Sequence, residues 1–224
     1  MTFALVARCV DTGMFGTAVA SSSPAVAARC SHVRTGVGAV SSQNVTDPTL
    51  GPKILDMMGD GLSSFAAIAE LNKTGKFMEY RQVLAIDCNG LSTIHSGQNV
   101  LGIWAEAQDA DVASAGNLLA NEMIPKSMIE AFLAAKGHLG DRLLTALRAG
   151  LTSGGEEGPI RSAGVKIVDR VTWPAVDLRC DWTENCPITE LESAWLIYKP
   201  QIADYIDRAI NPGKALPFTV PGNQ

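Results

Sequence analysis

The sequence predicts an α+β protein in which two mainly antiparallel β-sheets pack face to face beneath helices. Short β-type runs lie within residues 3–42 and again within 162–180, and amphipathic helical patterns lie between them. Strands grouped at both ends of a chain with helices between them favour two layered sheets covered by helices. Apolar residues make up 46% of the 224 residues, so a large core can form without metals or disulfides.

The first strands are predicted to form a hairpin. Phe3–Cys9 is a β-type run, Asp11-Thr12-Gly13 has turn chemistry, and Gly16–Ser21 returns from the turn. Val26–Arg29 is then a third strand or a short bridge. Thr35–Ser42 is a clearer strand, whose glycines favour a bulge or close backbone contact.

Helical periodicity follows this strand-rich region. Gly51–Gly59 and Ser63–Asn72 are predicted helices, the second with Ser63 or Ser64 as its N-cap. Arg81–Asp87 is a buried strand, and Leu91–His95 returns from the Asn89-Gly90 turn to complete a hairpin.

The second half alternates helices and strands before a helical C-terminal tail. Asp111–Asn117 is taken to lead into a helix near Glu122–Lys136. The later predicted elements are a helix at Asp141–Ala149, strands at Ser162–Val168 and Ala175–Cys180, and a helical tail over Pro187–Ile210 that breaks at Pro200. We therefore expect one main domain over residues 1–182. Residues 183–224 form an extension that packs on the same domain or on a partner subunit.

Composition excludes several functional classes. The net charge of −5, with no run of lysines or arginines, argues against nucleic acid as a partner. Five scattered cysteines without CxxC spacing and three distant histidines predict no disulfide framework, no metal site and no cofactor. No apolar run reaches the ~18 residues of a membrane span, and no signal peptide is evident. A cytoplasmic location is the expectation.

Three other catalytic arrangements are disfavoured. His95 and Ser96 are neighbours, but adjacent strand residues point to opposite faces, and no GxSxG motif is present. The glycine-rich stretches match neither a dinucleotide fingerprint nor a P-loop. Cys9 and Cys30 have apolar neighbours, which favours inert packing over reactivity.

Several blocks of the chain resemble the DUF1028 family. The opening Met1–Arg8 (MTFALVAR), Thr12-Gly13 and Gly16–Ser21 (GTAVAS) are similar to the start of that family. The further matching blocks are Arg34–Val40 with Gln43, Gly51-Pro52, Gly61-Leu62-Ser63, Gly97, Gly116-Asn117-Leu118, Arg161-Ser162-Ala163 and Asp177–Arg179. Ser22-Ser23-Pro24 departs from the large basic or aromatic pair of many relatives, so a pocket there would differ.

The resemblance implies an N-terminal-nucleophile (Ntn) hydrolase fold, a four-layer αββα sandwich. It also implies a mechanism in which the first residue of the mature chain is both nucleophile and base. If Met1 is removed, Thr2 carries a hydroxyl and an α-amino group with a pKa of about 7.7–8.0. The Thr–amine pair is a known variant of the nucleophile–base arrangement.

The remaining catalytic candidates are chosen to complete this chemistry. Asn117 is expected to stabilise the oxyanion, and Arg34 to repel the proton from the amine. Ser162 is expected to relay a proton or to orient the amine. Each has a plainer alternative as a turn residue, a solvated charge or a strand residue, and Thr2 itself could simply begin an edge strand. The residues expected to bind substrate are Ser22, Ser23, Gln43, Asn44 and Arg161.

Two functions remain open at this point. The first is an Ntn-type amidohydrolase that cleaves the C–N bond of a small amide. The second is a non-catalytic ligand-binding or scaffold protein that keeps the fold. The apolar tail residues, including Trp195, Leu196 and Tyr205, also suggest a homo-oligomer, in the simplest case a dimer.

Overall fold

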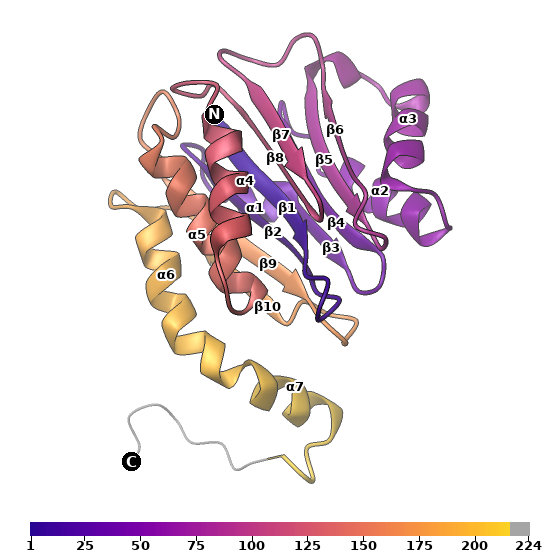
Figure 1. The fold of residues 1–224 in the computed structure, drawn as a ribbon, viewed down its shortest axis with the longest axis vertical. Coiled ribbons are helices and arrows are strands. Elements are labelled where there is room, and N and C mark those ends of the chain that lie inside the picture. Colours follow the sequence, from indigo (N-terminus) through magenta and orange to yellow (C-terminus); the bar gives the residue numbers. More distant parts are fainter. Residues whose placement is uncertain (216–224) are drawn as a thin grey trace.

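Two antiparallel sheets form the centre of the molecule (Figure 1). A computed structural model describes residues 1–215 of the chain. The six-stranded sheet has the order β10 (Val176–Cys180), β9 (Ser162–Val168), β2 (Phe15–Ser21), β1 (Thr2–Arg8), β8 (Val112–Asn117) and β7 (Ala105–Asp109). The four-stranded sheet has the order β3 (Ser31–Arg34), β4 (Gly38–Asn44), β5 (Arg81–Asp87) and β6 (Ser92–Ser96).

Helices cover the outer face of each sheet, which gives four layers. The six-stranded sheet carries α4 (Ile124–Ala134), α5 (Leu139–Thr152) and α6 (Pro187–Tyr198). The four-stranded sheet carries α2 (Leu50–Gly59) and α3 (Ser64–Thr74), and Ser63 caps α3 as predicted. A one-turn 3₁₀ helix, Met78–Tyr80, precedes β5. The αββα sandwich of two antiparallel sheets with a helical C-terminal stretch is confirmed.

Strand β1 shows how the sequence divides between layers. Phe3 and Leu5 point outward and pack in the core beneath α4 and α5. Val6 points inward and packs against Leu84 and Ile86 of the second sheet. Because β1 is covered on both faces, its residues form an almost continuous apolar run.

Two sequence predictions of local structure are wrong. Residues 26–30 form a short helix, α1 (Val26–Cys30), and β3 begins directly after it. One turn of helix is too short for periodicity to separate it from a strand. Residues 112–117 form β8, between β1 and the edge strand β7, where the sequence predicted only a segment leading to the next helix, and β7 itself was not predicted. The small residues of β8 fit between two packed layers, and they carry little strand signal by themselves.

The C-terminal stretch packs on its own chain. Ile188, Leu191 and Trp195 of α6 are buried in the core shared with α5, β9 and β10. Trp195 Nε1 donates a 2.8 Å hydrogen bond to Asp141 Oδ1 at the start of α5. Pro200 lies in a 3₁₀ turn (Lys199–Gln201) before α7 (Ile202–Ile210), as the predicted break requires. The predicted extension also includes residues 216–224, which lie outside the described residues.

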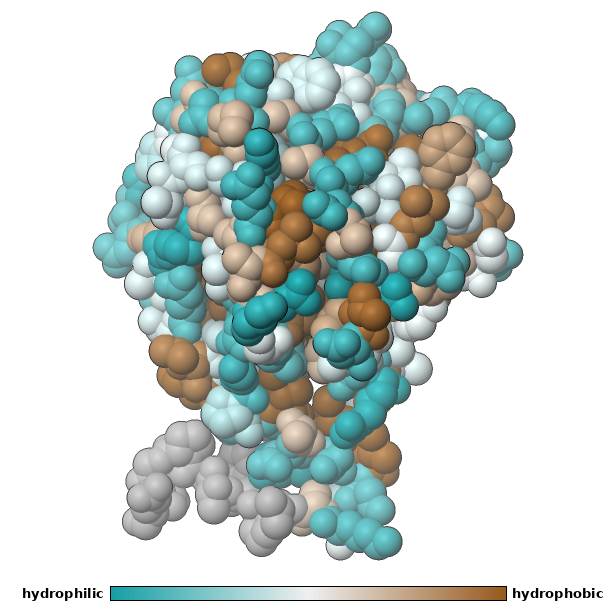
Figure 2. Space-filling view, viewed as in Figure 1, coloured by the Kyte–Doolittle hydropathy of each residue, from teal (hydrophilic) through white to brown (hydrophobic). Residues whose placement is uncertain are grey.

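The surface mixes hydrophilic and apolar residues. Figure 2 shows small apolar groups on the face in view, separated by hydrophilic side chains. None of the helices within residues 1–215 is long and apolar enough to cross a membrane. All five cysteines are free thiols, and the described residues contain no group of three or more potential metal ligands.

Candidate functional site

Thr2 lies at the start of β1, in the middle of the six-stranded sheet. It is opposite Asn117 of β8, while Ser21 of β2 is opposite Ser162 of β9. In a strand, alternate residues share a face. Thr2 therefore points inward with Ala4 and Val6, toward the second sheet. The polar side chains of Thr2, Ser21, Asn117 and Ser162 therefore lie at one end of their strands. It is the end of the sandwich where the chain begins (Figure 1).

A chain of hydroxyl groups starts at Thr2. Thr2 Oγ1 lies 3.4 Å from Ser21 Oγ, which lies 2.8 Å from Ser23 Oγ. Ser23 Oγ in turn accepts a 3.2 Å hydrogen bond from Arg29 Nη2 on α1. Both Thr2 Oγ1 and Ser21 Oγ lie 2.5 Å from the carbonyl oxygen of Met1, to which each can donate. The carbonyl of Met1 is thus bound where the chain of hydroxyl groups begins.

The second sheet contributes a row of amides that faces the first. Gln82 Oε1 accepts from Gln43 Nε2 at 2.8 Å and from Asn117 Nδ2 at 3.1 Å. Gln82 Nε2 donates to Ser96 Oγ at 2.9 Å. Gln43 Oε1 and Asn117 Oδ1 are buried without a hydrogen-bond partner in the structure. Unpaired buried acceptors are costly, and both of these oxygens lie at the end of the sandwich that holds Thr2.

Glu156 is a buried carboxyl group beside the same end of the chain. Its two oxygens accept from the Ser22 N–H at 3.2 and 2.9 Å, and the residue is only 5% exposed. Burial raises the pKa of Glu156 to about 7, although the nearby N-terminal ammonium and the Ser22 hydrogen bonds oppose this change. Glu156 can therefore gain or lose a proton near neutral pH.

A pocket of about 350 Å³ opens over Thr2. Thr2 itself is 6% exposed, so only a small part of it is accessible to solvent. Burial raises the pKa of the Cys30 thiol, which favours the unreactive protonated form. The residues that line the pocket are Met1, Thr2, Ser23, Val26, Arg29, Cys30, Asn44, Thr46 and Pro48.

Most of the residues predicted from the sequence gather here. Ser23 and Asn44 line the pocket, and Gln43 belongs to the buried amide network. Ser162 Oγ donates to the Ser23 carbonyl at 2.6 Å and accepts from Val26 N at 3.1 Å. These bonds fix the loop between β2 and α1, and the Ser162 hydroxyl forms no hydrogen bond with Thr2.

Two further predicted binding residues lie at the edge of this group. The Ser22 backbone N–H is bound to Glu156. Arg161 binds the carbonyl of Ser21 through its own N–H, but its guanidinium pairs with Glu184 at 2.7 Å and does not line the pocket.

Arg34 is not near Thr2, and the role predicted for it is wrong. Arg34 pairs with Gly38 at one end of β4, whereas Asn44 at the other end lines the pocket. Six residue steps along a strand span about 20 Å. The Arg34 guanidinium instead binds Asp56 Oδ1 at 2.7 Å and the Leu55 carbonyl at 3.1 Å. The positively charged side chain that lines the pocket is that of Arg29.

Sequence reasoning missed Ser21, Arg29, Gln82 and Glu156. Strand alternation could have found Ser21, because it ends β2 on the same face as Val19. Arg29 ends a segment for which the sequence predicts a strand or a short bridge, so its placement on a helix beside the pocket could not follow. Glu156 lies in a Gly/Glu-rich loop with no periodic signal, and its contact with Ser22 depends on tertiary structure.

The chain is similar to solved structures and to one family model. A crystal structure of protein SPO2555 from Silicibacter pomeroyi, a DUF1028 protein, is similar at 28% identity and a TM-score of 0.82, with 92% of each chain covered. Anbu (ancestral beta-subunit) from Yersinia bercovieri has 11% identity and a TM-score of 0.40, with 97% of this chain and 99% of that chain covered. No curated protein matches the chain. The model of DUF1028, described as a family of unknown function, matches residues 2–191, and the chain therefore belongs to the DUF1028 family.

Proposed function

We propose that this protein is an Ntn-type amidohydrolase that cleaves the C–N bond of a small amide. The observation that carries the proposal is the position of Thr2, whose buried hydroxyl begins a hydroxyl chain beneath a pocket of about 350 Å³. A pocket of this size suits a small molecule. The mechanism requires that Met1 is removed, because the amide nitrogen of an internal Thr2 cannot serve as a base.

The reaction has two balanced steps. In the first, the neutral Thr2 amine takes the hydroxyl proton while Oγ1 attacks the substrate carbonyl carbon. The C–N bond then breaks, and the leaving amine takes that proton, which leaves an ester on Thr2. In the second step, water loses a proton to the amine and attacks the ester. The acid product departs as Thr2 regains its hydroxyl proton.

Ser21 and Asn117 support this chemistry in different ways. Ser21 Oγ lies 2.5 Å from a carbonyl oxygen that also contacts the Thr2 hydroxyl, namely that of Met1. Ser21 is therefore suited to donate to a substrate oxyanion once Met1 has left. Asn117 Nδ2 is already bound to Gln82, and Asn117 Oδ1 has no partner. Acceptance of a hydrogen bond from the Thr2 amine suits Asn117 better than the oxyanion role predicted from the sequence.

Covalent labelling tests the nucleophile without knowledge of the substrate. A β-lactone probe opens when a hydroxyl attacks its carbonyl, and the whole probe is then retained as an ester. We expect one equivalent on the N-terminal peptide of the processed protein, detected by mass spectrometry. Thr2→Ser should still react, because it keeps the hydroxyl beside the amine, whereas Thr2→Ala should lose the adduct.

The matched control is Thr74→Ala, which removes an exposed hydroxyl at the end of α3. Its labelling should equal that of the wild type. An adduct that forms equally in Thr2→Ala, with that variant folded by its melting curve, would contradict the proposal. The non-catalytic reading would be favoured by saturable ligand binding together with the absence of any Thr2 adduct.

A further inference from the structure

Arg29 is the charged side chain that lines the Thr2 pocket. It lies in the last turn of α1 and is half-buried. No aspartate or glutamate is among the residues that line this pocket. Besides the N-terminus of the chain, the pocket therefore presents the positive side chain of Arg29, together with hydroxyl and amide groups, to any molecule that enters it.

The guanidinium of Arg29 is held in place by neutral acceptors. Nη1 donates to the carbonyls of Pro24 at 2.5 Å and Ala25 at 3.2 Å, and Nη2 donates to Ser23 Oγ at 3.2 Å. Arginine has five N–H donors. Within residues 1–215, Nε–H and one Nη2–H of Arg29 have no partner. Two N–H donors of the planar guanidinium group, Nε–H and one Nη2–H, are thus available to a ligand.

Arg29 also lacks the carboxylate partner that most other arginines of this chain have. The described arginines that form ion pairs are Arg8, Arg34, Arg148, Arg161, Arg170 and Arg179. Arg29 forms no such pair with a described residue. A half-buried guanidinium with free donors is well suited to bind a planar carboxylate through two parallel hydrogen bonds.

The distance from Arg29 to the nucleophile suits a small substrate. Two hydroxyls, those of Ser23 and Ser21, separate the guanidinium from Thr2 Oγ1, through contacts of 3.2, 2.8 and 3.4 Å. A carboxylate on Arg29 and a carbonyl carbon at Thr2 Oγ1 can therefore belong to one molecule, with a few covalent bonds between them. These contacts set an upper limit to the separation, and in an N-acylated amino acid only the amide nitrogen and the α-carbon separate the carbonyl carbon from the carboxylate.

We propose that the Thr2 pocket binds small amides that carry a carboxylate near the scissile bond, and that Arg29 binds this carboxylate. The inference rests on the proposed function for the identity of the reacting group. The binding itself depends only on Arg29 and the pocket. An experiment can therefore contradict carboxylate binding by Arg29 without contradicting hydrolysis by Thr2, and the reverse.

The test measures binding in the processed Thr2→Ala protein, so that no ligand is consumed. The ligands are N-acetyl-, N-hexanoyl- and N-benzoylglycine, each paired with its neutral carboxamide and titrated by calorimetry. A charge-assisted bond predicts that at least one acid binds about ten-fold more tightly than its carboxamide. The preference should weaken as salt rises, because an ionic contact is screened.

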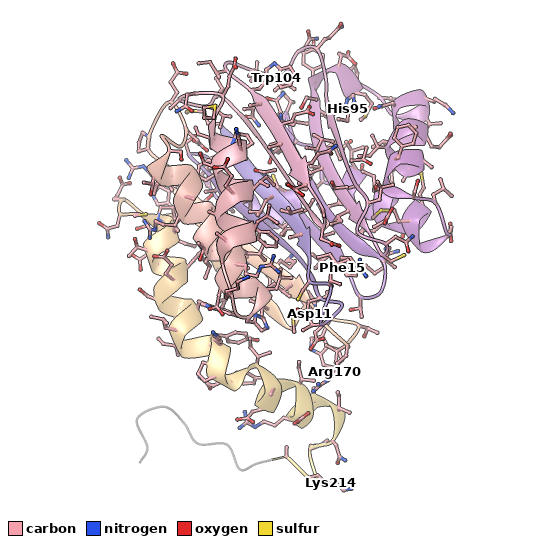
Figure 3. The ribbon with its side chains drawn as sticks, in the orientation of Figure 1. Asp11, Phe15, His95, Trp104, Arg170 and Lys214 are labelled. Carbon is pink, nitrogen blue, oxygen red and sulfur yellow. The ribbon has the colours of Figure 1, made fainter. Side chains whose placement is uncertain are left out.

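Arg29→Gln in the same background should reduce binding of the acid to the level of the carboxamide. Arg170→Gln is the matched control, since it removes one positive charge at the end of the molecule opposite Trp104 and His95 (Figure 3). Arg29→Lys keeps the positive charge but loses the planar guanidinium group. We expect its affinity for the acid to lie between those of the Arg29 protein and Arg29→Gln. Melting curves establish that each variant is folded.

Equal affinity for every acid and its carboxamide would overturn the inference. Failure of all three acids to bind, or a preference for the acid that survives in folded Arg29→Gln, would do the same. If the acids bind through Arg29 but the wild-type protein hydrolyses none of them and forms no Thr2 adduct, the binding inference stands and the proposed hydrolase function falls.

Discussion

At the scale of residues, the surroundings of Thr2 combine burial with polarity. Thr2 is 6% exposed, and Ser21, Asn117 and Ser162 on the neighbouring strands are fully buried. A row of buried polar groups costs stability unless hydrogen bonds satisfy it. Here Asn117 Oδ1 and Gln43 Oε1 stay unpaired. Local rules of folding are broken most often at functional sites, which supports the choice of this end of the sandwich.

Glu156 gives a pH-dependent prediction at this scale. Its pKa is about 7 in the folded protein and 4.5 for the free group. Below pH 4.5 Glu156 is protonated in both the folded and the unfolded state, so its titration does not change the free energy of unfolding. As pH rises from 4.5 to 7 the unfolded state ionises first, so the free energy of unfolding falls. Glu156→Gln removes this titration. Its stability relative to the wild type should therefore rise across this interval, by roughly 3 kcal/mol at most.

Urea denaturation at a series of pH values measures this difference. Glu157→Gln is the matched control, because it changes an exposed neighbour of the same charge and should add no pH dependence. A difference between Glu156→Gln and the wild type that stays constant from pH 4.5 to 7.5 would contradict the account of Glu156.

Thr2 and Arg34 show which site residues a sequence can reveal. The place of Thr2 follows from its number in the chain and from the strand that starts there. A role for Arg34 required knowledge of which end of β3 faces Thr2. Because residues 26–30 form a helix, the short β3 comes later than expected, and Arg34 ends it at the far end of the sheet. The distance between residues on different strands depends on the order and direction of the strands in the sheets. The pattern of residues in the sequence does not reveal that order.

At the scale of elements, α1 connects the two sheets and carries Arg29. Val26 and Ala27 of this helix are buried against Ala4 and Val19. The short helix approaches β9 closely at Gly164, where an added Cβ would lie 2.4 Å from Ala27 Cβ. Gly164 therefore sets the distance between α1 and the six-stranded sheet.

Gly164→Ala tests this close contact. The new methyl group must displace α1, and overpacking of this kind costs about 1–3 kcal/mol. Urea denaturation should show that loss. Gly59→Ala at the end of α2 is the control, since its Cβ would have no neighbour closer than 3.5 Å, and alanine favours a helix. Wild-type stability in Gly164→Ala would show that α1 does not pack as described.

The elements also differ in how well the sequence predicts them. Strands β1 and β2 and helices α3 and α5 are long enough for periodicity to identify them. Strands β7 and β8 escaped prediction, because β8 is built from Val, Ala, Ser, Gly and Asn, and β7 is a largely exposed edge strand. Strand β8 pairs with β1, and β7 pairs with β8, so the strand character of both depends on tertiary structure.

At the scale of the whole molecule, the side chains between the two sheets change from apolar to polar along the strands. Val6, Ala39 and Leu84 form an apolar layer in the middle. Toward the end where the chain begins, Gln43, Gln82 and Asn117 replace it. The apolar layer holds the sandwich together, and the polar end provides the place for chemistry. The four layers follow from the order of strands and helices, but the polar end does not.

The C-terminal stretch belongs to the same packed body, including Ile202 and Ile206 of α7. Ile188, Leu191 and Trp195 complete the core of their own chain, while Leu196 and Ile197 on the same helix are 76% and 64% exposed. Removal of the whole tail would therefore damage the fold itself. The homo-oligomer stays a prediction, and substitution of those two exposed residues followed by sizing tests it without that complication.

The central claim, that Thr2 acts through its own amine, is tested most directly by the intact mass of the untagged protein purified from cells. We predict a mass lower than that of the full 224-residue chain by one methionine residue, and an N-terminal peptide that begins at Thr2. Retention of Met1 on every molecule would leave the Thr2 nitrogen in a peptide bond and would contradict the mechanism.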